Sequence, residues 1–422
     1  MLTFADCLTR RKSQVSHKVV VIGGGAAGYF AAIHCAEANN DLEVLLIEKS
    51  SKVLQKVKVS GGGRCNVGYA CFDLKQLSLA YPRGEKQLKS AFARFSTKDT
   101  IAWFNSKNIT LKTEADGRMF PVSDNSQTII DCLEKAAKKL KVKVELEKGV
   151  KKIIPNFHGG FELLLDNGDK IACHKIIVAT GGSAKEEGFN WLKELGHRIE
   201  PPVPSLFTFN IPHNPIVELQ GIAINPARVR ILDTKLENSG PLLITHWGFS
   251  GPAILKTSSV GARILADKNY EFDVQISWLD NKREDSVRQE LFNLKAANPT
   301  KNIGKLFPFN LPKRLNSFLL AKAKVDEGAN WAEVSKEAVN DIINCLLYDT
   351  YHVVGKTTFK EEFVTCGGVN LDDVDFKTME SKRIKSLYFA GEVLDIDGIT
   401  GGFNFQAAWT TGYIAGKAAS VA

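Results

Sequence analysis

Three glycines in the stretch Lys18–Gly28 have the spacing of a phosphate-binding turn. The β-branched run Val19–Ile22 predicts a strand that leads directly into Gly23, Gly25 and Gly28, and helix-forming residues follow. In a unit of this kind the first glycine permits the turn, the second lets the backbone approach a pyrophosphate, and the third allows close helix packing. The helix N-terminus adds unpaired N–H groups and a partial positive charge. The spacing therefore predicts a site for the phosphates of a dinucleotide.

An acidic residue follows this turn at the position of a ribose contact. A second apolar run, Asp41–Glu48, ends in a carboxylate about 20 residues after Gly28, where it can accept hydrogen bonds from an adenosine ribose. The alternative is a plain βαβ unit with a surface glutamate. The combination of turn and acid favours the dinucleotide site.

The stretch Val59–Asn66, V-S-G-G-G-R-C-N, is expected to be a loop whose backbone lies close to a ligand. A flexible surface linker is the alternative, but Arg64 argues against it, because a fixed guanidinium suits a phosphate or a polarised ring oxygen. Cys65 is either a favoured thiolate or a small packing residue. Farther on, Gly117–Pro121 is either a loop near the ligand or an ordinary turn.

Two later apolar runs end in small residues in the same way. Lys175–Gly182 and Leu387–Gly391 each predict a buried strand, so three strand ends should release glycines at one edge of a parallel sheet. Gly401–Gly402 then precedes a helix that we expect to begin near Asn404. The N-terminus of such a helix would stabilise the negative charge that develops on a reduced flavin, which makes a flavin the predicted ligand.

The loop Thr245–Pro252, T-H-W-G-F-S-G-P, contains the candidate catalytic residue His246. Its imidazole could donate a proton or contact the substrate, and a purely structural histidine is the alternative.

The composition is that of an ordinary soluble globular protein, with 44% hydrophobic and 24% charged residues. The net charge of +8 favours anionic ligands, but no dense Lys/Arg block is interleaved with aromatic residues, so no nucleic-acid partner is expected. No apolar run reaches the roughly 18 residues of a membrane helix, and residues 1–17 lack the apolar segment of a signal peptide. The scattered cysteines include no C-x-x-C pair, which argues against a metal site or a disulfide framework and favours a cytoplasmic protein.

The order of the elements predicts an α/β fold with more than one domain. Helical spacing covers residues 85–106 and 124–140, and a D-N-G turn predicts a hairpin of Phe161–Leu165 with Lys170–Cys173. The expected domains are a Rossmann-like domain from residues 15–200 and 366–422, a β-rich insert from 201–280 and 348–365, and a helical subdomain from 281–347.

With these residues in hand, the chain resembles the flavoproteins with two dinucleotide-binding domains. More narrowly, it is similar to the BaiN/YhiN-type NAD(P)/FAD-dependent oxidoreductases, a family that includes aminoacetone-oxidase-like flavoproteins. The motifs that carry this resemblance from Lys18 onward are V-I-G-G-G-A-A-G, S-G-G-G-R-C-N, A-T-G-G, T-H-W-G-F-S-G-P-A, G-G-V and F-A-G-E-x-L-D-I-D-G-I-T-G-G-F-N-F-Q-A-A. Cys366, in T-C-G-G-V, departs from the residue that relatives commonly carry, which argues against a thiol-based mechanism shared by the family.

The resemblance implies a noncovalent FAD in a GR2-type Rossmann-like domain made from both chain ends, with an inserted β-barrel-like domain and a small helical domain. Val150 matches the position whose backbone faces the adenine. The residues expected to bind the cofactor are Gly23, Gly25, Ala26, Ala27, Gly28, Glu48, Lys49, Ser60, Gly61, Gly62, Gly63, Arg64, Cys65, Asn66, Val150, Thr180, Gly181, Gly182, Gly391, Glu392, Asp397, Gly402, Phe403 and Asn404.

The expected function is that of an FAD-dependent oxidoreductase that exchanges hydride or electrons with a small organic substrate. NAD(P)H is a candidate donor, although no second G-x-G-x-x-G is present to hold it. The family spans amine oxidation with oxygen and reduction of a carbon–carbon double bond, and no residue decides between them. Two alternatives from other classes are a flavin-dependent nucleic-acid (tRNA) modification enzyme and a flavin-binding protein without turnover.

Overall fold

The computed structural model describes residues 17–157, 159–357 and 364–421, and within them the chain forms two compact units. The first unit contains the described residues up to Pro201, Gly367–Ile396 and the segment from Gly401 onward. The second contains the described parts of Pro202–Cys366 together with Asp397–Thr400. The first unit therefore draws on both ends of the chain, while the boundaries of the three expected domains stay a prediction.

The first unit has a seven-stranded sheet at its core, and the α/β fold predicted from the sequence is confirmed. Five neighbouring strands are parallel, and two more continue the sheet in antiparallel orientation. Runs of Val, Ile and Leu form the central strands because parallel strands are covered on both faces. In spatial order the strands are β20 (Val374–Asp375), β21 (Glu380–Ser381), β22 (Leu387–Phe389), β10 (Lys175–Val178), β1 (Lys18–Ile22), β2 (Glu43–Ile47) and β6 (Lys143–Glu145). The carboxyl ends of β1, β10 and β22 thus meet at one edge.

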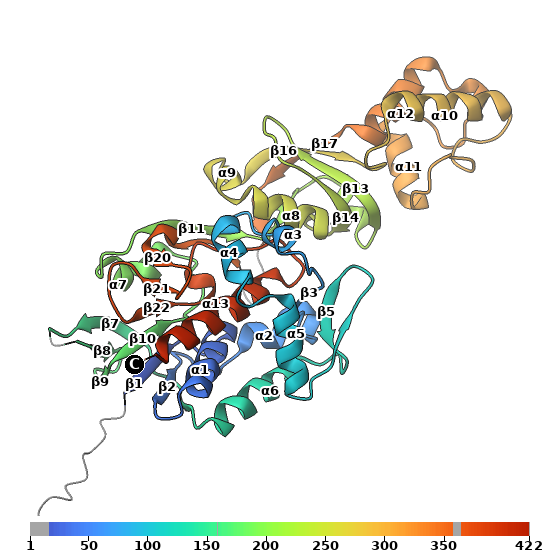
Figure 1. Ribbon diagram of the computed structural model, residues 1–422. Coiled ribbons are helices and arrows are strands. Elements are labelled where there is room, and N and C mark those ends of the chain that lie inside the picture. The colour runs from blue at the N-terminus through green and yellow to red at the C-terminus, as the bar shows by residue number, and fades with distance from the viewer. Residues whose placement is uncertain (1–16, 158, 358–363, 422) are drawn as a thin grey trace, which may run out of the picture. The chain divides into compact units, whose positions relative to one another are not determined.

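Two helices from opposite ends of the chain, α1 (Ala26–Ala38) and α13 (Phe403–Ala419), pack side by side (Figure 1). A Cβ atom on Gly412 would lie 2.7 Å from the carbonyl oxygen of Ala27, and one on Gly416 would lie 2.4 Å from that of Ala31. Glycine is therefore required for this close approach. Because the two contacts advance together along both helices, α1 and α13 run parallel, and their N-termini point in the same direction.

Shorter elements complete the first unit. Its other helices are α2 (Gln55–Gly63), α3 (Leu74–Ser78), α4 (Glu85–Phe92), α5 (Thr97–Ser106), α6 (Ser126–Lys139) and α7 (Asn190–Lys193). Two three-stranded antiparallel sheets accompany them, with the orders β3 (Gly68–Tyr69), β5 (Arg118–Pro121), β4 (Leu111–Thr113) and β7 (Val150–Pro155), β8 (Phe161–Leu165), β9 (Lys170–Cys173). The predicted hairpin is confirmed as β8 and β9. The ordinary-turn interpretation of Gly117–Pro121 holds for Gly117, which donates its N–H to the carbonyl of Glu114 in the turn between β4 and β5, but Arg118–Pro121 pairs on both sides as β5.

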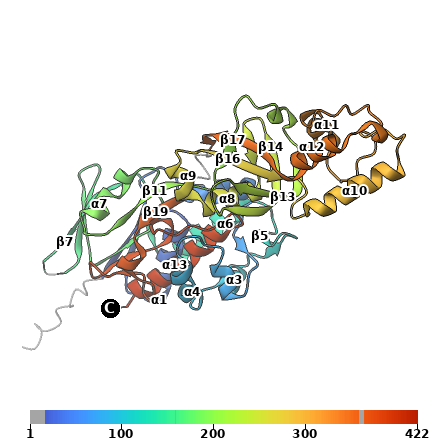
Figure 2. The same cartoon turned by 90° about the horizontal axis from the view of Figure 1, so that it is seen from above.

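The second unit is built on an antiparallel seven-stranded sheet. Alternate residues of its strands are buried, as expected for a sheet with one core face. In spatial order the strands are β17 (Asp349–Val354), β16 (Glu271–Ser277), β13 (Ala223–Ile231), β14 (Glu237–Thr245), β15 (Gly248–Ser250), β12 (Thr208–Asn210) and β18 (Lys356–Thr357). Helix α8 (Pro252–Val260) lies beside β13 and β14, also in the view from above (Figure 2), and α9 (Ala262–Asp267) follows it.

Three helices of the second unit, α10 (Glu284–Ala297), α11 (Lys313–Lys322) and α12 (Lys336–Leu347), lie together beyond β16 and β17. A buried carboxylate joins them to the sheet. Asp349 accepts hydrogen bonds from the Trp278 indole at 2.9 Å and from the Tyr351 hydroxyl at 2.5 Å, and it pairs with the ammonium of Lys322. The paired charge and the two hydrogen bonds satisfy the carboxylate away from water.

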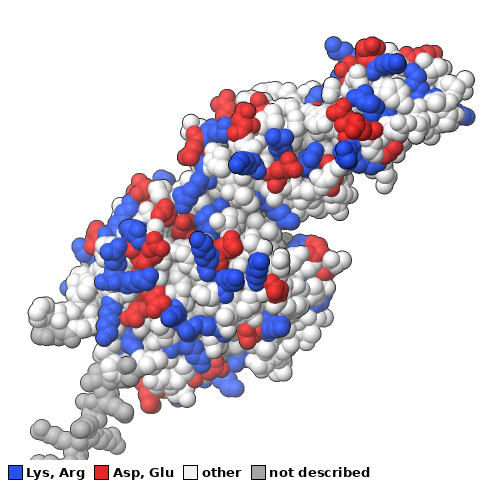
Figure 3. Space-filling view, turned by 45° about the horizontal axis from the view of Figure 1, so that its top comes forward, with Lys and Arg blue, Asp and Glu red and all other residues white. Residues whose placement is uncertain are grey.

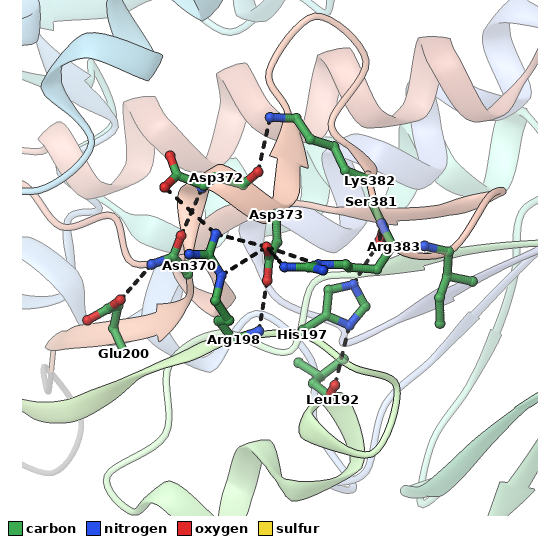
Figure 4. A network of polar contacts seen from close by, with 11 residues as sticks. Leu192, His197, Arg198, Glu200, Asn370, Asp372, Asp373, Ser381, Lys382 and Arg383 are labelled. Carbon is green, nitrogen blue, oxygen red and sulfur yellow. Dashed lines mark hydrogen bonds and ion pairs between the residues drawn. The ribbon is translucent and has the colours of Figure 1, made fainter.

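The connecting strands β11 (Ile199–Ser205) and β19 (Val364–Val369) pair with each other. A polar network in the first unit secures the start of β11 (Figure 4). Asp373, whose side chain is buried, accepts hydrogen bonds from the backbone N–H of Arg198 at 2.8 Å and from its guanidinium at 3.0 and 3.1 Å. The guanidinium of Arg383 donates two more at 2.9 and 3.1 Å. The Asp373 carboxylate thus holds Arg198, shortly before the chain leaves the first unit, and Arg383, after the chain has returned to it.

Candidate functional site

The turn between β1 and α1 leaves a single glycine facing open space. A Cβ on Gly23, whose φ is 112°, would lie 2.4 Å from the carbonyl oxygen of Ala179, and one on Gly28 would lie 1.9 Å from that of Gly23. These two positions therefore tolerate only glycine. A Cβ on Gly25 would meet no described atom within 4 Å. Gly25 is half-buried and begins α1 as its N-cap, so its backbone and the helix N-terminus, with Ala26 and Ala27, would offer N–H groups to a phosphate.

Glu48 is fixed beside this turn by backbone donors. Its Oε2 accepts the N–H of Gly24 at 2.7 Å, and its Oε1 accepts the N–H and the hydroxyl of Ser50 at 2.9 and 2.8 Å. A carboxylate has about four acceptor positions, so capacity remains for ribose hydroxyls. Gly24 and Ser50, which the sequence analysis did not single out, hold this acid in place.

The end of α2 turns into the expected glycine loop. Gly61, Gly62 and Gly63 have φ angles of 59°, 70° and 83°, and Ser60 has an extended backbone. Cβ atoms on Gly62 and Gly63 would meet nothing within 4 Å among the described residues. The glycine loop, defined here as residues 60–63, therefore presents bare backbone whose N–H groups can form an anion-binding concavity.

The structure places Arg64 against the protein itself. Its guanidinium carbon lies 3.9 Å from the centre of the Phe120 ring, and its Nη1 donates to Glu114 at 2.6 Å and lies 3.5 Å from Asp124. Cys65 is fully buried, and burial raises the pKa of its thiol to about 12, an effect partly opposed by a hydrogen bond from Ser60. This environment favours the packing interpretation of Cys65 over the thiolate.

The start of α13 meets this segment. Gly402 is the N-cap of α13, and a Cβ there would lie 2.7 Å from Oδ1 of Asn66, a buried oxygen with no hydrogen-bond partner in the described chain. Phe403 stacks on Tyr69 with ring centres 4.8 Å apart. The Trp409 indole donates to the carbonyl of Val67 at 2.9 Å. These contacts hold the segment after the glycine loop against α13, whose first N–H groups, including that of Asn404, point beyond the helix.

The segments after β10 and β22 supply further expected residues of the first unit. Gly181 has a φ of 75° and open space at its Cβ position, between the exposed Thr180 and the half-buried Gly182. Gly391 donates its N–H to the Thr411 hydroxyl at 2.9 Å, and a Cβ on it would lie 2.7 Å from that of Ala27. Glu392 forms an ion pair with Lys56 at 2.8 Å.

Val150 and Lys49 lie near Glu48, the predicted ribose contact. Val150 is half-buried at the start of β7, and the preceding Lys148 donates its N–H to the carbonyl of Glu48 at 2.8 Å. A Cβ on Gly149 would lie 3.5 Å from the Cβ of Lys49. These two residues are therefore neighbours of Glu48, where the adenosine is expected.

Two predicted residues belong to the second unit. Asp397 is fully buried there and accepts a hydrogen bond from the Ser205 hydroxyl at 2.6 Å. His246 is exposed in the turn between β14 and β15, with its ring centre 4.4 Å from that of Trp247. The predicted roles of both residues therefore stay predictions.

The residues of the first unit fit an FAD. Bare glycine backbone at Gly25, Gly62–Gly63 and Gly181, an acid beside the first turn, the unpaired Asn66 oxygen and two parallel helix N-termini match a ligand with two phosphates, a ribose and a polar ring. Sequence reasoning missed Tyr69, and it included Phe120 only as part of the candidate loop Gly117–Pro121. Aromatic residues next to glycine-rich segments were the available signal, but only the fold brings them together.

The described residues contain neither a metal site nor a membrane-spanning helix. No group of three or more His, Cys, Asp or Glu side chains there could hold a metal ion. In the same part of the chain, no helix is both long enough and apolar enough to cross a membrane.

Comparisons with known proteins agree with this geometry. The model of the HI0933-like protein Rossmann domain matches residues 17–418. The 3-dehydro-bile acid delta(4,6)-reductase of Clostridium scindens is 26% identical over 412 residues, which cover 96% of this chain and 99% of that protein. The ribosomal RNA dihydrouridine synthase of Haemophilus influenzae is 29% identical over 413 residues, 95% of this chain and 98% of the relative.

A solved structure resembles the fold as a whole. The 3-ketosteroid-delta4-(5alpha)-dehydrogenase of Rhodococcus jostii, in complex with 4-androstene-3,17-dione, superposes with a TM-score of 0.51 at 15% identity. The match covers 98% of this chain and 99% of the other. At this identity the likeness concerns the fold alone.

Proposed function

Because the chain belongs to the HI0933-like Rossmann family of FAD-dependent oxidoreductases, we propose that it is a reductase that adds two hydrogens across a carbon–carbon double bond conjugated to a carbonyl group. When bound, FAD supplies the hydride transfer between a donor and an acceptor carbon. The physiological donor in this proposal is NAD(P)H, which would bind transiently, since the sequence has no second dinucleotide motif.

The observation that carries this proposal is a reaction common to two relatives with different substrates. One full-length relative is named as a delta(4,6)-reductase of a 3-dehydro-bile acid, and another as a dihydrouridine synthase. Dihydrouridine differs from uridine by two hydrogens across a ring double bond next to a carbonyl, so both names describe the same bond change.

The residues of the first unit have separable tasks in this proposal. Gly23–Gly25 and Glu48 would hold the ADP half, and the glycine loop with Asn66 would hold the remainder of the cofactor. The N-terminus of α13 at Gly402 would stabilise negative charge on the reduced ring through its dipole. His246 is the candidate proton donor, and its exposure lets it exchange protons with water.

The test is a product assay with the full chain, FAD and NAD(P)H. We expect a conjugated steroid dienone or a uracil-containing substrate to gain two hydrogens by mass spectrometry, with deuterium transferred from labelled donor. Rapid oxidation of amines by oxygen, without reduction of any double bond, would favour the amine-oxidase alternative instead. A chain that binds FAD but turns over no donor would favour flavin storage.

A narrower candidate within this reaction is the reduction of uridine in RNA. The identity of 29% over nearly the whole length of a ribosomal RNA dihydrouridine synthase and the net charge of +8 favour it, against the expectation that no nucleic acid is a partner. On the face drawn in Figure 3, however, Lys and Arg are interspersed with Asp and Glu rather than gathered in a stripe. Incubation with ribosomal RNA fragments separates the candidates, because only an RNA enzyme would produce dihydrouridine at a defined site.

A further inference from the structure

Arg64 makes three contacts, all with the β4–β5 hairpin or with the loop that follows it. The guanidinium stacks on Phe120 of β5, and its Nη1 donates to Glu114 between the two strands and lies near Asp124 after them. Its side chain is one-third exposed, so the contacts are only partly shielded from water. A planar guanidinium suits this combination of ring stacking and charge-assisted hydrogen bonding better than an ammonium does.

The same hairpin also contacts the glycine loop. A Cβ on Gly61 would lie 2.9 Å from the edge of the Phe120 ring, so the glycine backbone rests directly on that ring. Val67 donates its N–H to the carbonyl of Met119 at 2.9 Å, and Cys65 donates its N–H back to Ser60 at 3.0 Å. In contrast, a Cβ on Gly62 or Gly63 would meet no atom within 4 Å among the described residues. Arg64 directly follows Gly63, and its contacts with Phe120 and Glu114 join this end of the loop to the hairpin.

We infer that Arg64 is a positioning residue, which clamps the glycine loop onto Phe120 and Glu114 so that the loop stays open for the part of FAD beyond its ADP half. This inference rests on the proposed binding of FAD. It differs from the sequence-based expectation that the guanidinium contacts the cofactor itself, because the guanidinium already pairs with Glu114, which it shares with Arg118, and with Asp124.

The two roles of Arg64 make opposite predictions for Glu114→Gln. In the clamp, the substitution removes the charged partner and loosens the loop, so FAD binds more weakly. If Arg64 were a cofactor ligand, the same substitution would release the guanidinium and leave FAD affinity unchanged or higher. Glu114 itself is on the hairpin and has no part in either predicted cofactor contact.

The experiment measures dissociation constants of FAD and of ADP for the full apo chain by calorimetry, with thermal unfolding of each apo variant alongside. We expect Arg64→Lys and Glu114→Gln each to weaken FAD binding by roughly tenfold, the usual size for a charge-assisted hydrogen bond, and to leave ADP binding unchanged. The double variant should lose less FAD affinity than the sum of the two single effects, because both substitutions weaken the Arg64–Glu114 contact. Asp116→Asn, which removes the exposed partner of Arg118 in the same hairpin, is the matched control and should change neither constant.

Three outcomes would overturn the inference. Unchanged or tighter FAD binding by Glu114→Gln, with weaker binding of both FAD and ADP by Arg64→Lys, would make Arg64 a phosphate ligand. Equal loss of FAD and ADP affinity in both variants, together with lowered apo melting temperatures, would make the contact merely structural. Failure of the unaltered chain to bind FAD at all would refute the proposed function and the clamp with it, which distinguishes that case from the other two.

Discussion

At the scale of single residues, the glycines of the first turn divide into two kinds. Gly23 and Gly28 are required by the protein, since a Cβ at either position would collide with a backbone carbonyl. Gly25 has open space where its Cβ would be, so nothing in the described fold requires glycine there. The explanation that we propose for its absent side chain is a ligand that approaches the backbone.

A matched pair of alanine substitutions tests this division. Gly28→Ala should destabilise the apo chain by about 2–4 kcal/mol, as overpacked positions do, and lower its melting temperature. Gly25→Ala should leave the apo melting temperature unchanged and weaken FAD binding at least about tenfold, because the methyl group occupies the phosphate's space. Equal FAD affinity in Gly25→Ala and the unaltered chain, measured by fluorescence titration, would show that the cofactor lies elsewhere.

His246 allows a second test at this scale. His246→Gln removes the proposed proton donor and keeps a polar side chain of similar reach. We expect turnover to fall by about 10²-fold, the lower range for general acid catalysis, with the FAD dissociation constant unchanged. A variant with undiminished turnover under saturating donor would leave His246 a structural residue.

The sequence predicted the glycines but not the surroundings of Arg64. Glycine spacing reflects a local chain geometry, so the turn and its strand could be read from residues 18–28. The partners of Arg64 lie 50 and 60 positions away, at Glu114 and Asp124. No local pattern encodes such contacts, and a guanidinium beside glycines looks the same whether it binds a phosphate or a carboxylate.

At the scale of elements, α13 and the start of β11 are held by buried polar groups. Thr411 accepts the N–H of Gly391, which ties the end of β22 to α13, and Asp373 gathers Arg198 and Arg383. Burial alone would raise the pKa of Asp373, but hydrogen bonds from the backbone and guanidinium of Arg198 and from Arg383 outweigh it and lower the pKa. A lowered pKa in the folded state stabilises the fold at pH values above the unfolded pKa.

Asp373→Asn tests this network through its pH dependence. At neutral pH the substitution should cost about 1–3 kcal/mol, because it removes the charged acceptor of two half-exposed guanidinium groups. The stabilisation in the unaltered chain should be lost as the pH falls below about 4 and through the lower folded pKa. The melting temperatures of the two proteins should therefore converge in acid. A constant difference between them down to the acid limit would contradict the assigned pKa shift.

The strand and helix positions near the site were largely predictable, while the sheet of the second unit was not. Val19–Ile22, Lys175–Val178 and Leu387–Phe389 are short apolar runs with glycine at their ends, and each is a parallel strand. In the second unit β12 pairs with β18, from residues almost 150 positions later, and β13 pairs with β16. Such pairings depend on long-range closure of the chain, which residue propensity does not specify.

At the scale of the whole molecule, both chain ends build one unit and the middle of the chain builds the other. The family model matches residues 17–418, which include both parts of the first unit. The relatives match over nearly their whole length and are named for different substrates, so membership of the family does not specify the substrate. The proposed function is therefore defined by its reaction, the reduction of a conjugated carbon–carbon double bond, and not by one substrate.

Anaerobic stopped-flow reduction of the FAD-loaded chain tests that reaction most directly. We expect NADH or NADPH to bleach the oxidised-flavin absorbance, and a conjugated dienone or a uridine-containing RNA to restore it without oxygen. With air as the only oxidant, the reduced flavin should be reoxidised slowly. The proposal would be contradicted if neither dinucleotide bleaches the flavin, or if amines bleach it and oxygen alone rapidly restores it.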